Sequence, residues 1–164
     1  MPAVAAARTG AKTILVERYG HLGGQFSGGI VLELPQVFPD VEPWRMVGLC
    51  QEMLDRATAL GGCLYPSKEE VGSTDKKVVD YWRTRTGRIG REGTVGFSSF
   101  FDPELLKCLL NDLVEEAGVK LLLHSWGVQA IVEDGRVKGV IFESKSGRQA
   151  ILADVVVDTT GDGD

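Results

Sequence analysis

The sequence predicts an α/β fold: an incomplete parallel sheet, joined by an antiparallel β-meander and a helical insertion. Three stretches of the chain carry this prediction. A helical segment leads into a short apolar strand over residues 3–16, and a capped helix leads into another strand over residues 102–123. Alternating apolar residues with turn signals then follow over residues 127–152. The 164 residues, 43% hydrophobic and 25% charged, suit a globular domain.

The amino-terminal stretch is typical of the second half of a βαβ unit. Ala3–Thr9 is rich in alanine and is followed by Gly10, so a helix is expected to end there. Thr13–Val16 is β-branched and apolar, as in a buried strand, and Glu17 follows it directly. An acid at this point of a Rossmann unit can accept hydrogen bonds from the ribose hydroxyls of an adenosine. The first strand and its G-x-G-x-x-G turn are absent, and we expect them upstream of Met1.

The middle of the chain predicts one helix followed by a long irregular segment. Trp44–Leu60 carries apolar residues at three- and four-residue spacings, and Gly61 and Gly62 end the pattern. Periodicity then fails over residues 65–99, a polar segment with four arginines. An arginine in it could clamp a substrate carboxylate, but a solvated surface loop is the favoured interpretation. The four are Arg83, Arg85, Arg88 and Arg91.

The clearest predicted helix is Asp102–Gly118, with Asp102 as N-cap and Pro103 at the first helical position. A strand at Val119–Leu123 is expected to follow it. The stretch Gly127–Glu143 then reads as a hairpin, and a third strand at residues 149–152 completes a meander. The carboxyl-terminal stretch predicts a second buried strand at Ala153–Asp158, which leads into the sequence T-T-G-D-G-D.

Composition and charge exclude several classes of function. The net charge of −5 and the lack of a basic tract argue against a nucleic-acid surface. No apolar run approaches the ~20 residues of a membrane span, and the amino terminus lacks the order of a signal peptide. We therefore expect a cytoplasmic protein with reduced thiols. The cysteines Cys50, Cys63 and Cys108 form no C-x-x-C pair and indicate neither a zinc site nor an iron–sulfur site.

The stretch A-A-A-R-T-G-A-K-T-I-L-V-E-R-Y-G-H-L-G-G resembles the flavin-binding segment of FAD-dependent oxidoreductases of the two-dinucleotide-binding-domains superfamily. It is most similar to the heterodisulfide reductase-like group of that superfamily. The order of the later elements agrees with this resemblance. It implies an incomplete Rossmann-like FAD-binding domain made of residues 1–34 and 101–164. Residues 35–100 would then be an inserted part of the substrate domain.

The resemblance also implies which residues hold FAD. Glu17, with Arg18 beside it, would bind the adenosine ribose, and Gly23 and Gly24 would present backbone to the pyrophosphate and the ring. Val128 would pair with the adenine through its backbone. Gly161 and Asp162 would contact the ribitol–phosphate region. Ser27 could lie close to the flavin, or belong to a glycine-softened strand; both interpretations stay open. The cofactor-binding positions that the resemblance implies are therefore Glu17, Arg18, Gly23, Gly24, Ser27, Val128, Gly161 and Asp162.

The residues that would carry out catalysis are not evident from the sequence. His21 lies in the glycine loop and is the better candidate of the two histidines, although lining the loop is the favoured role. His124 is expected to be structural. The resemblance implies a small-molecule substrate or a redox partner protein, and relatives in the group often work with iron–sulfur clusters. Two other interpretations remain: an NAD-type dinucleotide-binding module, and a catalytically inactive fragment.

Overall fold

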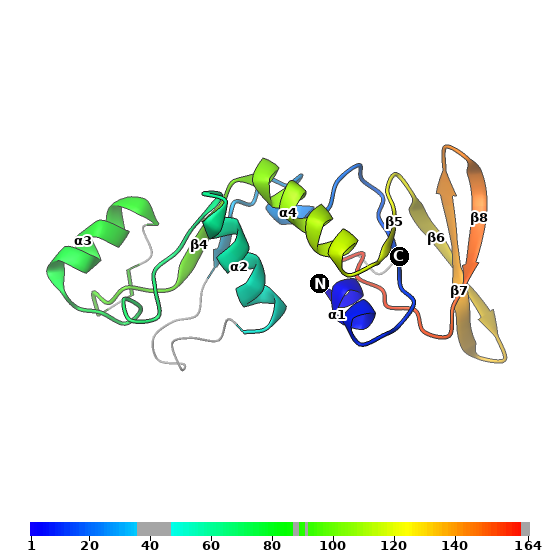
Figure 1. The fold of residues 1–164 in the computed structure, drawn as a ribbon, viewed down its shortest axis with the longest axis horizontal. Coiled ribbons are helices and arrows are strands. Elements are labelled where there is room, and N and C mark those ends of the chain that lie inside the picture. The colour runs from blue at the N-terminus through cyan, green and yellow to red at the C-terminus, as the bar shows by residue number, and fades with distance from the viewer. Residues whose placement is uncertain (36–46, 87–88, 91, 162–164) are drawn as a thin grey trace. The chain divides into compact units, whose positions relative to one another are not determined.

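The computed structural model describes residues 1–35, 47–86, 89–90 and 92–161, and Figure 1 labels its four α-helices and strands β4 to β8. The chain divides into two compact units. The first unit is Met1–Leu22 with Asp112–Asp164, and the second is Gly23–Asn111. The predicted α/β class is confirmed, since the described residues form a parallel pair of strands, two antiparallel sheets and four α-helices. The predicted domain boundaries stay a prediction.

The first unit begins with a helix and a parallel pair of strands. Helix α1 is Pro2–Arg8, and Gly10 after it adopts a φ of 96°, which a residue with a side chain rarely adopts. Strand β1 is Ile14–Val16 and pairs with β5, Lys120–Leu122, in parallel. Both strands thus end at the same edge, where the residues that follow them come together.

The first unit also contains the predicted meander. Strands β6 (Trp126–Glu133), β7 (Arg136–Ser144) and β8 (Gly147–Leu152) form one antiparallel sheet and lie side by side in Figure 1. Asp134 and Gly135 join β6 to β7 with φ values of 49° and 72°. Two positive φ values are the mark of the turn whose twist matches a hairpin. The hairpin prediction is confirmed.

The second unit contains a three-stranded antiparallel sheet in the order β2-β4-β3. Its strands are β2 (Glu33–Pro35), β4 (Ser98–Phe101) and β3 (Cys63–Leu64), and a short 3-10 turn, η1, covers Gly24–Phe26. The predicted helix of residues 44–60 is present as α2, Leu49–Ala59, which buries Met53, Leu54 and Ala57. The start of that prediction, residues 44–46, lies outside the described residues.

Helix α4 is Pro103–Glu116 and begins as predicted. The Asp102 carboxylate accepts hydrogen bonds from the backbone N–H groups of Glu104 (2.9 Å) and Leu105 (3.0 Å). These donors have no partner within the helix, so the cap stabilises its first turn. The buried side chains of the helix share one face and are Leu106, Leu109, Leu113 and Val114.

The prediction of a surface loop over residues 65–99 is wrong. Helix α3, Lys76–Arg85, forms there, and Asp75 caps it by accepting hydrogen bonds from two backbone N–H groups. Its inner face is Val79 and Trp82, which pack with Val95 in a buried cluster. Val78 packs against this cluster as well. Six of the ten residues of the helix are polar or charged, so the sequence does not show a clear helical periodicity. Arg88 and Arg91 lie outside the described residues.

The prediction of a buried strand at Ala153–Asp158 is also wrong. No described strand pairs with this segment, and the side chains of Val155 and Val157 are 77% and 65% exposed. A run of valines is apolar enough for a sheet interior. A strand, however, also needs a neighbour that takes up its backbone N–H and C=O groups.

Candidate functional site

Glu17 lies at the carboxyl end of β1, as the sequence predicts. Its backbone N–H donates to the carbonyl of Leu122 (2.8 Å), and its own carbonyl accepts from the N–H of Ser125 (2.9 Å). Oε1 of the carboxylate accepts from the backbone N–H of Tyr19 at 2.8 Å. The half-buried side chain is thus held in place while most of its lone pairs stay available, because a carboxylate offers about four acceptor positions.

Beside Glu17, the Arg18 guanidinium lies over two aromatic rings. Its central carbon is 4.6 Å from the centroid of the Tyr19 ring and 5.5 Å from that of Trp126. Arg18 also donates a hydrogen bond to the Tyr19 hydroxyl. Trp126 is the first residue of β6 and is 60% exposed. A cation–π contact at an exposed site is worth about 0.5–1 kcal/mol, so the two rings favour this position of the guanidinium.

The two histidines both lie near this strand end. The His124 backbone N–H donates to the Tyr19 carbonyl (3.1 Å), and a Cβ added to Gly20 would lie 2.6 Å from the His124 ring. Glycine at position 20 therefore lets the imidazole approach the loop closely. The His21 ring stacks on that of Tyr19, with centroids 5.7 Å apart and planes 5° apart. Both side chains support the loop, and neither is assigned a catalytic role.

We call Glu17, Arg18, Tyr19, His124 and Trp126 the strand-end cluster. The sequence predicted its first two members. It missed Trp126, although a signal was available. Trp126 follows β5 by four residues, and parallel strands end at the same edge of a sheet, so residues just after β5 must approach those just after β1.

Val128, the predicted adenine-binding residue, lies two residues beyond Trp126 on the edge strand β6. The register between β6 and β7 shifts between Gly127 and Gln129, and Val128 has no partner residue in it. Such an irregularity takes a backbone out of the regular ladder. The structure thus brings Glu17, Arg18 and the start of β6 together in one unit.

Gly23, Gly24 and Ser27 lie in the second unit, within one turn around η1. Gly23 and Gly24 have φ values of 109° and 51°, and a Cβ on Gly23 would lie 2.4 Å from the Ser27 hydroxyl oxygen. A Cβ on Gly24 would have open space. Ser27 is fully buried, and its hydroxyl donates to the Gly24 carbonyl at 3.4 Å. Their proposed contacts with a cofactor stay predictions.

Gly161 and Asp162 are the last two predicted residues along the chain. Gly161 is exposed and has a φ of 95°, and Asp162 lies outside the described residues. Just before them, the Asp158 carboxylate accepts a hydrogen bond from the Thr160 backbone N–H (2.8 Å). That bond lowers the pKa of Asp158 because it favours the charged carboxylate. The segment therefore forms a turn at its acidic residue.

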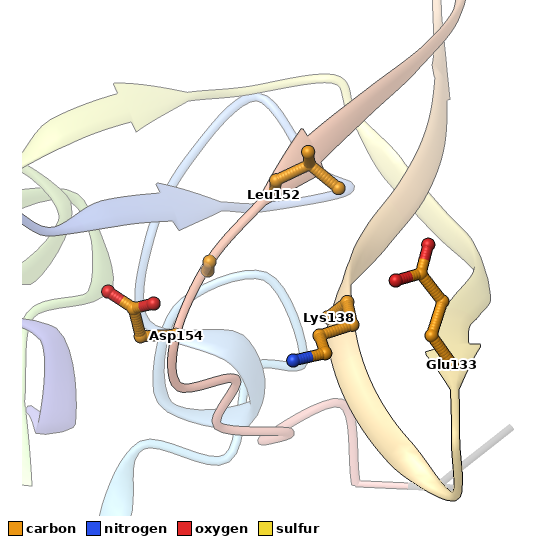
Figure 2. Close-up of a pocket in the computed structure, with 5 residues that line it drawn as sticks. Glu133, Lys138, Leu152 and Asp154 are labelled. Carbon is orange, nitrogen blue, oxygen red and sulfur yellow. The ribbon is translucent and has the colours of Figure 1, made fainter.

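A pocket of about 350 Å³ lies at the opposite end of the meander from Trp126. Its walls are Glu133, Lys138, Leu152, Ala153 and Asp154. Figure 2 shows the charged side chains of β6, β7 and the segment after β8 around it. None of the predicted site residues lines this pocket.

The part of the chain that the structure describes contains neither a candidate metal-binding group nor a candidate membrane-spanning helix. Across residues 1–35, 47–86, 89–90 and 92–161, no three His, Cys, Asp or Glu residues are grouped so that they could hold a metal ion. None of the helices described in these ranges is long and apolar enough to cross a membrane.

A sequence profile described as FAD dependent oxidoreductase matches residues 1–164. The chain belongs to this family. The predicted cofactor, FAD, and the predicted class, oxidoreductase, are thereby confirmed at the level of the family. A search of curated proteins found no match.

Several solved structures are similar to this FAD-dependent oxidoreductase chain at low identity. THI4 of Thermovibrio ammonificans is 16% identical with a TM-score of 0.47, and the match covers 96% of this chain and 51% of that one. Glycerol-3-phosphate dehydrogenase from Bacillus halodurans, complexed with FAD, is 15% identical with a TM-score of 0.47. That match covers 92% of this chain and 29% of the dehydrogenase chain. L-amino acid deaminase from Proteus myxofaciens in complex with anthranilate is 15% identical (TM-score 0.45; 89% and 40% covered). The chain spans about half the length of THI4 and less of the other two.

Proposed function

We propose that the strand-end cluster binds the adenosine of FAD, and that the chain is the FAD-binding part of an oxidoreductase. The observation that carries this proposal is the carboxylate of Glu17 at the carboxyl end of a parallel strand. In open α/β sheets, ligands bind outside the carboxyl ends of the strands. The Tyr19 N–H holds one oxygen of this carboxylate, and the remaining acceptor positions suit the two hydroxyls of a ribose.

The other residues of the first unit fit the same ligand. Val128 lies outside the β6–β7 register, so its backbone is suited to pair with an adenine edge. Arg18 presents a planar cation beside Glu17, over the rings of Tyr19 and Trp126. Gly161 and Asp162 would serve the ribitol–phosphate region.

In the second unit, Gly23 and Gly24 would present backbone to the pyrophosphate and the ring, and Ser27 would lie near them. FAD, when bound, supplies hydride or electron transfer, while the protein supplies position and electrostatics. Among FAD-dependent oxidoreductases, we place the chain near the heterodisulfide reductase-like group, on the A-A-A-R-T-G-A-K-T-I-L-V-E-R-Y-G-H-L-G-G stretch. The substrate would be a small molecule or a redox partner protein.

The test is a titration of the full chain with FAD, in which flavin fluorescence measures binding. Glu17→Ala should weaken FAD binding by about 1–3 kcal/mol, because the ribose hydroxyls lose their acceptor. Glu133→Ala removes a carboxylate from the opposite end of β6 and is the matched control, which should bind like the wild type. FMN, which lacks adenosine, should bind much more weakly than FAD.

Two results would overturn the proposal. One is an FAD affinity that is the same for Glu17→Ala and for the wild type. The other is tight binding of NADH by a chain that does not bind FAD, which would support a nicotinamide module instead.

A further inference from the structure

Helix α3 concentrates positive charge on an acidic protein. Four of the 18 basic residues of the chain and only one of its 23 acidic residues lie in this ten-residue helix, whereas the net charge of the chain is −5. The buried side of the helix is occupied by Val79 and Trp82, so the basic side chains lie on the solvent side. They are Lys76, Lys77, Arg83 and Arg85, all exposed.

The solvent side of α3 carries two rows that differ in their pairing. In the first row, the Asp80 carboxylate binds Lys76 and lies 3.2 Å from the Arg83 guanidinium. The hydrogen bond from Lys76, aided by the charges of both cations, lowers the pKa of Asp80. Asp80 therefore compensates one of the two positive charges of this row within the helix itself.

The second row is Lys77, Tyr81 and Arg85, which we call the α3 basic stripe. These residues follow one another at intervals of four, so they lie on one face of the helix. No carboxylate among the described residues pairs with Lys77 or Arg85. Within the described part of the chain, the stripe therefore keeps two cations that no carboxylate compensates.

Two contacts within the helix hold the Arg85 side chain against Tyr81. Its guanidinium carbon lies 3.6 Å from the centroid of the Tyr81 ring, and its Nη1 donates to the Tyr81 carbonyl at 3.1 Å. Tyr81 is nevertheless 43% exposed. Tyrosine and arginine are the residue types that dominate binding energy in protein interfaces, and an ordered side chain loses less entropy on binding.

We propose that the α3 basic stripe docks an acidic segment of a partner protein. Two carboxylates of the partner would pair with Lys77 and Arg85, and an intervening part of the segment would pack on Tyr81. A guanidinium can hold a carboxylate through two parallel hydrogen bonds, which gives the contact a defined geometry.

The spacing of the stripe favours a polypeptide over a small anion. Lys77 and Arg85 are eight residues apart, which in a helix is about 12 Å at ~1.5 Å per residue. A single small carboxylate does not span this length, whereas an acidic helix or an extended segment does. Nucleic acid fits less well, because a protein that contacts about six to ten phosphates needs a larger basic surface, and α3 offers four basic residues beside one acid on an acidic chain.

The test uses the full chain and a defined probe. A fluorescein-labelled peptide of four EAAA repeats presents glutamates four residues apart on a helix, and the QAAA peptide with the same label lacks these four carboxylates. Fluorescence anisotropy at low and at high salt would measure binding. The wild type should bind the EAAA peptide more tightly than the QAAA peptide, and salt should weaken the binding.

Matched charge reversals locate the contact. The variant K77E/R85E should weaken binding of the EAAA peptide by about tenfold or more. The control R136E/K145E changes the net charge by the same amount at exposed positions of the β6–β8 meander, and should change binding by less than about twofold. Tyr81→Ala should also weaken binding, whereas Arg85→Lys should keep part of it. Circular dichroism would verify that each variant is folded.

Four results would overturn the proposal. The first is a wild type that does not bind the EAAA peptide. The second is an equal loss of binding in both double variants, which would show that only the overall charge of the chain matters. The third is a uridine 12-mer that binds more tightly than the peptide. The fourth is a wild-type dimer in sedimentation velocity that K77E/R85E abolishes, which would assign the stripe to a second copy of this chain.

Discussion

The backbone of Gly139 in β7 lies so close to Ile151 in β8 that no side chain fits between them. A Cβ on Gly139 would lie 2.1 Å from the carbonyl oxygen of Ile151 and 3.0 Å from its carbonyl carbon. The neighbouring pairs in the register are Gly139 with Leu152 and Val140 with Ile151. The close contact is between main chains, so a change of rotamer cannot relieve a clash there.

Gly139→Ala should therefore destabilise the meander. Overpacking of this kind typically costs about 1–3 kcal/mol, and a main-chain obstacle favours the upper end of the range. Gly127→Ala is the control in the same sheet, because its Cβ would meet only Val140, at 3.8 Å. Urea denaturation would compare the free energies of unfolding. Equal stability of the two variants would show that β7 and β8 do not approach each other at Gly139 as described.

Removal of the Asp102 side chain, which caps α4, should destabilise the chain less than Gly139→Ala does. Asp102→Ala leaves the N–H groups of Glu104 and Leu105 without their acceptor, at a cost of about 1 kcal/mol. Asp102→Asn keeps a side-chain oxygen and should retain most of the stability. Thermal unfolding followed by circular dichroism would measure both variants, and an alanine variant as stable as the asparagine variant would contradict the cap.

The contact of Arg18 with Trp126 predicts a coupling energy between these positions. A double-mutant cycle of Arg18→Ala and Trp126→Ala, based on the free energies of unfolding, should give a coupling energy of about 0.5–1 kcal/mol. This is the range of an exposed cation–π pair. Trp126→Phe keeps an aromatic face and should preserve part of the coupling. A cycle in which the two single effects simply add would show that the side chains do not interact in solution.

The three free cysteines should differ in reactivity. Burial raises the pKa of the Cys63 thiol to about 11, so it stays protonated at neutral pH, while Cys50 and Cys108 are exposed. Iodoacetamide at pH 8 should label the two exposed cysteines first. Labelling of Cys63 should accelerate as the pH rises toward 11, because only the thiolate reacts. Mass spectrometry of digests would follow each site, and uniform labelling rates at pH 8 would contradict the burial of Cys63.

Elements whose ends carry specific chemistry could be predicted from the sequence. Asp102 and Pro103 locate the start of α4, and Asp134-Gly135 locates the β6–β7 turn, because few residues suit these backbone positions. The position of Glu17 at a strand end followed in the same way from the short apolar run before it.

Elements that depend on distant partners could not be predicted. Helix α3 buries its apolar residues in a cluster with Val95, which lies thirteen residues beyond Trp82, so the local sequence alone predicted a loop. The run Val155–Val157 showed the opposite error, since its apolar residues predicted burial that no described neighbour provides. The contact of Arg18 with Trp126 likewise arises from β1 lying next to β5, which a local pattern does not reveal.

The pairing of β1 with β5 has a consequence for the order in which the chain folds. Ile14 pairs with Lys120, whereas the strands of the meander are joined by two-residue turns. Closing the long loop costs more conformational entropy than forming the turns, and a hairpin forms in roughly 1–10 μs. During synthesis, β1 leaves the ribosome before β5 has been made, so it cannot pair until Lys120–Leu122 has emerged about a hundred residues later.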